Sequence, residues 1–186
     1  MSKMFFLTDV EATGPDFATH SMYEFAMVPV LTNGTVLPGM KFEVDLLSYH
    51  ETDHYADTLK FLEKDLGITI DSLRARKNIL HPNAAMEMCN EFVSHHLSEN
   101  RADKPLFVAD NLAFDWGYMH TYFFRYLKQN PFGYAGRNIP DLSLGYYGSR
   151  SFWERFRTQQ HTHDALDDTA GNAGAFAHMI KDGLKV

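Results

Sequence analysis

Two carboxylates near the N-terminus follow an apolar run that has the composition of a buried strand. Asp9 and Glu11 come directly after Phe5–Leu7 in the segment FFLTDVEATGP. Side chains alternate along a strand, so both carboxylates point to the same face. Neighbouring carboxylates repel and raise each other's proton affinity unless a positive charge lies between them. The pair therefore predicts a partner of opposite charge at this place.

Three further side chains of related chemistry occur later in the chain. Asp115, in NLAFD, falls in the first turn of an expected helix just past a strand, and His163 and Asp168, in HTHDALDDTAG, lie at the start of the last expected helix. Strand ends and helix starts converge on one crevice in open α/β sheets. Four carboxylates gathered there can hold two divalent cations about 3.5–4 Å apart, one beside each reacting oxygen of a phosphodiester.

The acids of HTHDALDDT divide into capping and candidate catalytic residues. Asp164 lies where an N-cap is expected and Asp167 three residues further on, and both acids are favoured at a helix N-terminus. Asp168 is left without a capping role. His161 and His163 both remain candidates on these grounds. Because a separation of five does not put His163 and Asp168 on one helix face, we expect His163 on the preceding loop.

The expected elements form an α/β domain with a mixed sheet, since three strands in a meander are followed by helices that alternate with further strands. The turn at Asn33-Gly34 is typical of a hairpin. A length of 186 residues fits a single domain over 1–186. The expected strands are 3–11, 24–31, 35–44, 105–110 and an edge strand at 138–144, and the expected helices are 57–66, 71–77, 82–97, 113–127 and 165–181.

The distribution of charge along the chain bears on which kinds of nucleic acid the protein could bind. The formal net charge of −7 argues against a protein that coats long duplex nucleic acid. Residues 125–157 nevertheless carry a net charge of +4, against −11 for the remainder, and are rich in aromatic residues. Cations interleaved with aromatic rings suit a channel for single-stranded nucleic acid, and they equally suit a loop-rich surface over an aromatic core. Both interpretations stay open for this segment taken alone.

The number of cysteines and the hydropathy of the chain indicate the cellular compartment in which we expect the protein. The single Cys89 excludes an internal disulfide and fits a reducing environment. No apolar run approaches the ~18 residues of a membrane span, and the N-terminus lacks a signal-peptide layout. We therefore expect a cytoplasmic protein with no membrane partner.

The order D-x-E, N-x-x-F-D and H-x(4)-D resembles that of the DEDDh 3′→5′ exonucleases, the DnaQ-like family that includes proofreading subunits, oligoribonuclease and RNase T. The resemblance extends from Phe5 to about Ala177. It implies an RNase H-like fold with a central five-stranded mixed sheet flanked by helices. It also implies two divalent metal ions, Mg²⁺ or Mn²⁺, and release of nucleoside 5′-monophosphates from a 3′ end.

The resemblance also implies a role for each matching residue. Asp9, Glu11, Asp115 and Asp168 are the implied metal ligands, with Asp9 similar to the carboxylate that bridges both ions. His163 is the implied general base, and an imidazole suits this role because its unperturbed pKa lies near neutrality. The family spacing from the last acid thus favours His163 over His161.

Substrate contacts are expected around the segment ATGP, which resembles the family's TTGL. In the family, the backbone at the positions of Thr13 and Gly14 lies near the terminal sugar, and Pro15 replaces the leucine that wedges against the last base. Phe17 and Tyr118 are candidate stacking residues, and Asp110 is assigned to a turn. The predicted substrate-binding residues are Ala12, Thr13, Gly14, Pro15, Phe17, Asn111 and Tyr118.

The expected function is a metal-dependent 3′→5′ exonuclease acting on single-stranded or short DNA or RNA with a free 3′ end. The acidic total favours short substrates, and the choice between RNA and DNA stays open because it requires contacts to the 2′-hydroxyl. One alternative is an exonuclease subunit that works only within a polymerase or RNA-processing complex. Another is a catalytically silent nucleic-acid-binding module, which the paired carboxylates disfavour because they repel phosphate without metal. A homodimer is a further partner that the family allows.

Overall fold

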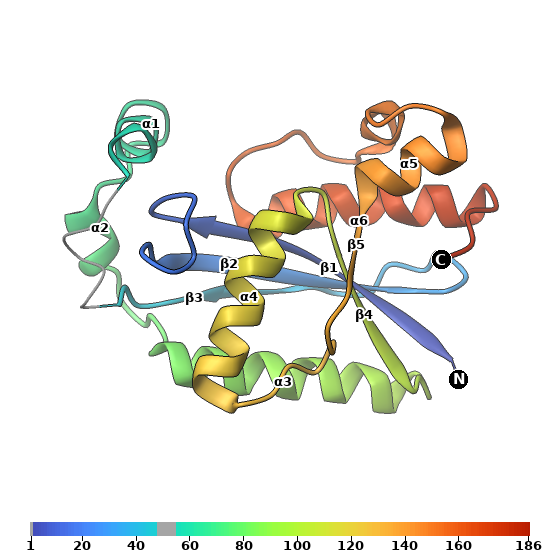
Figure 1. The fold of residues 1–186 in the computed structure, drawn as a ribbon, viewed down its shortest axis with the longest axis horizontal. Coiled ribbons are helices and arrows are strands. Elements are labelled where there is room, and N and C mark those ends of the chain that lie inside the picture. Colours follow the sequence, from blue (N-terminus) through green and yellow to red (C-terminus); the bar gives the residue numbers. More distant parts are fainter. Residues whose placement is uncertain (1, 48–54) are drawn as a thin grey trace.

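One five-stranded mixed sheet organises the chain, as predicted (Figure 1). The computed structural model describes residues 2–47 and 55–186. The strand order is β3-β2-β1-β4-β5, in which β1 is antiparallel to β2 and parallel to β4. The outer pairs are β2 with β3, which is antiparallel, and β4 with β5, which is parallel. The strands are β1 (Lys3–Ala12), β2 (Met22–Leu31), β3 (Met40–Glu43), β4 (Lys104–Ala109) and β5 (Gly136–Asn138).

Helices cover both faces of this sheet. The long helices α3 and α4 lie on one face, and α5 and α6 lie on the other with a short 3₁₀ helix, η2 (Figure 1). Among the described residues, none of the helices combines the length and the apolar character needed to cross a membrane. The helices are α1 (Ala56–Leu66), α2 (Ile70–Arg74), α3 (Pro82–Glu99), α4 (Leu112–Leu127), α5 (Ile139–Tyr147), η2 (Phe152–Phe156) and α6 (Ala165–Lys181).

The alternation of side chains along β1 divides the core into two layers. Phe6 packs into the cluster under α3 and α4, whereas Phe5 and Leu7 pack into the cluster under α6. Since side chains two residues apart share a face, Asp9 and Glu11 continue the α6 side of the strand beyond the apolar cluster. The strand therefore delivers its two carboxylates toward the start of α6.

The β2–β3 hairpin turns at Asn33-Gly34, as predicted. Gly34 has φ +79°, a conformation that glycine adopts without strain, and its N–H donates to the Leu31 carbonyl at 2.9 Å. The expected strand 35–44 is shorter in the structure, because β3 begins only at Met40. Gly39 lies so close to β2 that an added Cβ would come within 2.5 Å of Val28 Cγ2.

The predicted edge strand at 138–144 is wrong. The structure ends β5 at Asn138 and continues as α5. Pro140 lies at the start of this helix, where its missing N–H costs no hydrogen bond, and Asp141 in the first turn favours the same helix end. Gly148, with φ +76°, ends the helix. These helix signals outweigh the strand propensity of the segment.

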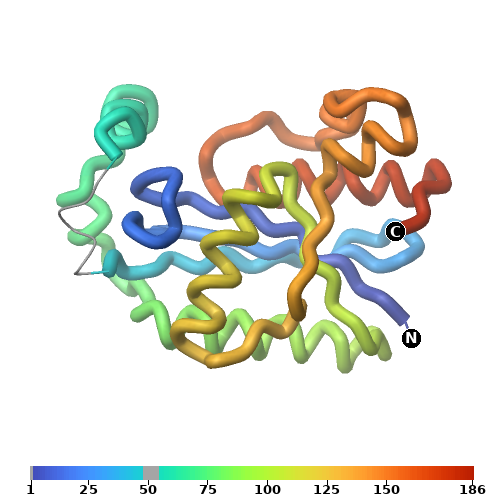
Figure 2. The backbone as a smooth tube through the Cα atoms, viewed as in Figure 1, coloured from blue at the N-terminus to red at the C-terminus, as the bar shows by residue number. Residues whose placement is uncertain are grey.

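A small subdomain formed by α1 and α2 lies beyond the end of β1 that carries the carboxylates (Figure 1). Its apolar cluster joins Leu62 and Leu73 to Tyr23 of β2. Gly67, with φ +67°, ends α1 as expected. Both chain termini lie at the opposite end of the molecule (Figure 2), where Lys3 Nζ donates to the Val186 carbonyl at 2.8 Å.

Candidate active site

Asp115 lies directly beside the two carboxylates of β1. The pairing of β1 with β4 ends at Leu7 and Val108, and β1 continues past this point. There the N–H of Val10, the residue between Asp9 and Glu11, donates to Asp115 Oδ1 at 3.1 Å. The first turn of α4 thus brings the third carboxylate to the edge of β1, as the sequence motifs predicted.

The fourth carboxylate reaches the same place from α6. Carboxylate oxygens of Asp9, Glu11 and Asp168 lie within 4.8 Å of one another. Asp164 caps the helix through Oδ1, which accepts the N–H groups of Leu166 and Asp167, so the capping role predicted for Asp164 is confirmed.

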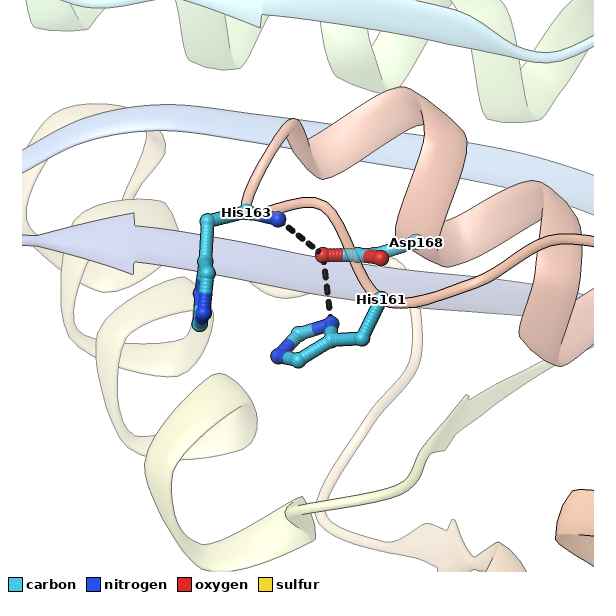
Figure 3. A group of neighbouring side chains, drawn as sticks. All are labelled: His161, His163 and Asp168. Carbon is cyan, nitrogen blue, oxygen red and sulfur yellow. Dashed lines mark hydrogen bonds and ion pairs between the residues drawn. The ribbon is translucent and has the colours of Figure 1, made fainter. Parts of the chain in front are cut away.

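Asp168 is held in place by donors from the loop before α6 (Figure 3). Its Oδ1 accepts the Thr162 N–H at 2.9 Å and the Arg157 guanidinium at 3.3 Å. Its Oδ2 accepts the His163 N–H at 2.8 Å and lies 2.6 Å from His161 Nδ1. The fully buried carboxylate therefore fixes the loop that carries both candidate histidines.

His163 lies on this loop, as predicted, in a left-handed conformation with φ +61°. Its Nδ1 is 3.9 Å from Glu11 Oε1, and its ring contacts Phe61 of α1 edge-on at 4.9 Å between centroids. Burial lowers the pKa of His163, and the neighbouring His161 lowers it further. A lowered pKa favours the neutral form of the imidazole, which is the form that accepts a proton.

Negative charge is poorly compensated at the centre of this group. Asp9 Oδ2 and Asp115 Oδ2 are buried with no hydrogen-bond donor among the described residues. Burial, together with the charge of Asp115, raises the pKa of Asp9 well above its ordinary range. Burial and the charge of Glu24 raise the pKa of Glu11 to about 8. Orphaned, closely spaced carboxylate oxygens are what a hard divalent cation requires, so the residues fit the metal site that the motifs imply.

A cavity of about 300 Å³, here termed the acidic cavity, opens over these groups. Sequence reasoning assigned Asp110 only to a turn, and its Oδ1 does accept the Asn111 N–H at 2.9 Å. Asp110 also lines the acidic cavity, and its position at the end of a buried strand was the available signal. The cavity is lined by Asp9, Val10, Glu11, Asp110, Asn111, Phe114, Asp115, His161 and His163.

A second cavity, of about 170 Å³, adjoins the acidic cavity and is termed the Gly14 cavity. Ala12, Gly14 and Pro15 line it, which is compatible with the predicted substrate contacts of the ATGP segment. Thr13 is fully buried, and its Oγ1 accepts the Ser21 N–H at 3.0 Å, so its side chain holds the loop. The complete lining is Val10, Glu11, Ala12, Gly14, Pro15, Thr58, Phe61, Leu62 and Phe114.

The predicted stacking role of Tyr118 is wrong. Its side chain is fully buried, and its hydroxyl donates to the Gly14 carbonyl at 2.7 Å, so the ring supports the loop from beneath. Phe17 is 39% exposed and stays a predicted contact. It lies so close to Gly117 of α4 that an added Cβ would come within 2.4 Å of its ring. Asn111, which lines the acidic cavity, also stays a prediction.

Glu24 of β2, which sequence reasoning did not single out, anchors the start of α6. It is opposite Glu11 in the antiparallel register and only 5% exposed. Its Oε1 accepts the N–H of Ala165, the first residue of α6, at 3.1 Å and lies 3.7 Å from Lys41 Nζ. Lys41 in turn binds Asp164 at 2.7 Å. A charged residue in an otherwise apolar strand was the only sequence signal.

Comparison with known proteins agrees with this geometry. No protein-family model matches the chain. The chain is 26% identical over 189 residues to an Escherichia coli protein named 3′-5′ DNA exonuclease Cap18, with 96% of this chain and 92% of that protein covered.

The fold is similar to that of solved exonucleases. A crystal structure of a full-length 3′-exonuclease matches with a TM-score of 0.66 at 18% identity, covering 100% of this chain and 84% of that one. A zinc-bound complex of E. coli exonuclease I with single-stranded DNA matches with a TM-score of 0.58 at 17% identity, covering 99% of this chain and 40% of that one. The predicted RNase H-like fold and the resemblance to DnaQ-like 3′→5′ exonucleases are therefore confirmed.

The raised pKa of Glu11 predicts a pH-dependent effect of Glu11→Gln on the stability of the metal-free protein. Because the folded-state pKa is about 8 and the ordinary value is 4.5, folding favours the protonated group, and its stability contribution is lost as the pH rises through 8. In the presence of a chelator, thermal unfolding should show that Glu11→Gln raises Tm relative to wild type more at pH 8.5 than at pH 5.5. Exposed Glu91→Gln is the control, and an equal Tm difference at both pH values would contradict the prediction.

The anchoring role of Glu24 predicts a large effect of Glu24→Ala. The substitution leaves the Ala165 N–H and Lys41 without their buried charged partner, which should cost about 1–3 kcal/mol of unfolding free energy in urea denaturation. Glu43→Ala is the matched control, because Glu43 pairs with Glu24 across the sheet but its side chain is 39% exposed. Its effect should stay below about 1 kcal/mol. Equal losses in the two variants would refute the anchoring role.

Proposed function

We propose that the protein is a metal-dependent 3′→5′ exonuclease that removes nucleoside 5′-monophosphates from the 3′ end of single-stranded or short oligonucleotides. The observation that carries this proposal is the meeting of Asp9, Glu11, Asp115 and Asp168, from three separate parts of the chain, beside His163. DNA is the favoured substrate, because the curated relative is named for activity on DNA. RNA is the second substrate class to be tested.

Two divalent cations, Mg²⁺ or Mn²⁺, would be held by Asp9, Glu11, Asp115 and Asp168, and would supply positive charge to the phosphate and lower the pKa of the attacking water. The orphaned oxygens of Asp9 and Asp115 support this assignment. The zinc-bound exonuclease I complex is a fold neighbour that contains a divalent metal.

His163 is proposed as the general base. Its neutral ring accepts one proton of the attacking water while the water oxygen forms a bond to phosphorus. The bond from phosphorus to the 3′ oxygen of the preceding nucleotide breaks, and that oxygen takes up a proton from solvent. The products are one nucleoside 5′-monophosphate and a shortened strand with a 3′-hydroxyl.

His163 suits this role better than His161. The Nδ1 of His161 lies 2.6 Å from Asp168, so this ring is engaged by a carboxylate. Both rings line the acidic cavity, but His163 Nδ1 is 3.9 Å from Glu11 Oε1, which is beyond hydrogen-bond distance. The two backbone bonds from residues 162 and 163 to Asp168 keep the loop, and hence the base, beside the carboxylates.

Several properties remain proposals alongside this activity. They are a single exonuclease domain over residues 1–186, a free 3′ end as the binding determinant, a cytoplasmic location and a homodimer. Cleavage of free oligonucleotides by the isolated chain would exclude a strict need for a polymerase or RNA-processing complex. A silent binding module would bind oligonucleotides without releasing mononucleotides at any Mg²⁺ or Mn²⁺ concentration.

The metal assignment predicts that Asp9→Asn and Asp168→Asn each lower Mn²⁺-dependent mononucleotide release by about a thousandfold, equivalent to ~4 kcal/mol of activation free energy. Both changes retain side-chain size but remove the charge that a cation requires. Release is measured with a 5′-labelled thymidine oligonucleotide. Asp167→Asn, next to Asp168 on the exposed side of α6, is the control and should stay within about twofold of wild type. Wild-type rates in both site variants would refute the proposal.

The general-base assignment predicts different effects for the two neighbouring histidines. His163→Ala should lower the rate by about 10²–10⁴-fold, because it removes the proton acceptor. His161→Ala removes a neighbouring ring that binds Asp168 but leaves the proton acceptor in place, and should cost less than tenfold. Single-turnover rates with saturating oligonucleotide separate the chemical step from binding. The reverse ranking would transfer the role of base to His161.

A further inference from the structure

A third cavity, of about 540 Å³, lies beside the acidic cavity and has no role in the function proposed above. We term it the Trp153 cavity. Its volume falls within the range of about 300–1,000 Å³ that is usual for ligand sites. It is formed by η2 and by residues 157–161, which lead into the loop before α6. The lining residues are Asp110, Trp153, Glu154, Arg157, Thr158, Gln159, Gln160 and His161.

The three cavities are contiguous through shared walls. Asp110 and His161 line both the Trp153 cavity and the acidic cavity. Val10, Glu11 and Phe114 line both the acidic cavity and the Gly14 cavity. The acidic cavity therefore lies between the other two. A phosphodiester held over the carboxylates has one nucleoside on each side, so a terminal nucleoside in the Gly14 cavity directs its neighbour toward the Trp153 cavity.

The walls of the Trp153 cavity suit a nucleobase better than a phosphate. Glu154 and Asp110 would repel a phosphate, whereas the amides of Gln159 and Gln160 offer both donors and acceptors. Nucleobase edges present the same mixture. The indole N–H of Trp153 is buried and has no acceptor among the described residues.

Arg157 connects this cavity to the carboxylates. Its guanidinium donates to Asp168 Oδ1 at 3.3 Å and lies 6.0 Å from the centre of the Trp153 ring. Its side chain is 14% exposed, so one face of a rigid cation forms part of the wall. A planar guanidinium can stack on a base while it keeps its bond to Asp168.

We propose that the Trp153 cavity is the subsite for the penultimate nucleobase, on the 5′ side of the phosphodiester that is cleaved. This inference rests on the proposed exonuclease activity and gives the bound strand its direction, from the Trp153 cavity through the acidic cavity to the Gly14 cavity. The smallest well-bound substrate is then a dinucleotide unit with both bases present.

The test combines a substrate that lacks the penultimate base with a variant that lacks two side chains of the cavity wall. The substrates are a thymidine tetranucleotide and the same chain with an abasic nucleotide at the penultimate position. The wall variant is the double substitution Glu154→Ala/Gln160→Ala, which changes two exposed residues of the cavity wall. The matched control is Glu91→Ala/Gln129→Ala, which changes the same residue types elsewhere on the exposed surface. The measured quantity is kcat/KM for release of the first nucleotide.

Loss of the base should lower kcat/KM about tenfold in the wild type and in the control, in line with the contribution of one bound base. In the double variant Glu154→Ala/Gln160→Ala, the abasic substrate should lower kcat/KM by less than about threefold. The missing base and the altered wall remove the same interaction, so their effects are not additive. An equal tenfold loss in the wall variant, or no loss in the wild type, would overturn the subsite while leaving the exonuclease activity intact. Failure of the wild type to cleave the intact tetranucleotide would overturn the activity itself, and the subsite with it.

Discussion

The concentration of buried negative charge at the end of β1 is the constraint on which the rest of the site depends. Asp9 and Asp115 each keep a buried oxygen without a donor among the described residues, and the pKa of both groups is raised. Such groups cost folding free energy unless a cation shares them. The unpaired oxygens of Asp9 and Asp115 lie together where β1 extends beyond its pairing with β4 and the helix α4 starts. The arrangement is understandable as a binding site and has no value as packing.

The surrounding structure positions the carboxylates while one oxygen of Asp9 and one of Asp115 keep no donor among the described residues. Backbone N–H donors orient Asp115 and Asp168, and Glu24 ties the first residue of α6 to β2. Rigid strands and helix starts therefore define the site, while the two histidines lie on a loop that Asp168 itself organises. Asp168 in this way holds the loop that carries His163, the proposed general base.

Features of the site that follow from neighbouring residues, such as strand alternation and helix capping, were predictable from the sequence. The surroundings of Tyr118 and Glu24 were not, because they depend on contacts between distant segments. Alternation along β1 put Asp9 and Glu11 on one face, and the capping rules put Asp164 at the N-cap of α6, as the structure has them, because both rules act within a few residues. Tyr118 was a candidate stacking residue because helical position does not reveal that the ATGP loop covers it. The strand expected at 138–144 is α5 instead, and this error was a local one, since Pro140 at the start and Gly148 at the end are helix signals present in the sequence. Glu24 was missed because its partners Ala165, Arg76 and Lys41 lie 141, 52 and 17 residues away.

The binding of divalent cations by the four carboxylates is tested most directly by soaking a crystal of the protein in Mn²⁺ and recording anomalous scattering at the manganese edge. We expect two anomalous peaks among the carboxylates of Asp9, Glu11, Asp115 and Asp168, within coordination distance of Asp9 Oδ2 and Asp115 Oδ2, which have no donor among the described residues. No peak at these carboxylates at millimolar Mn²⁺, with the side chains placed as described, would contradict it.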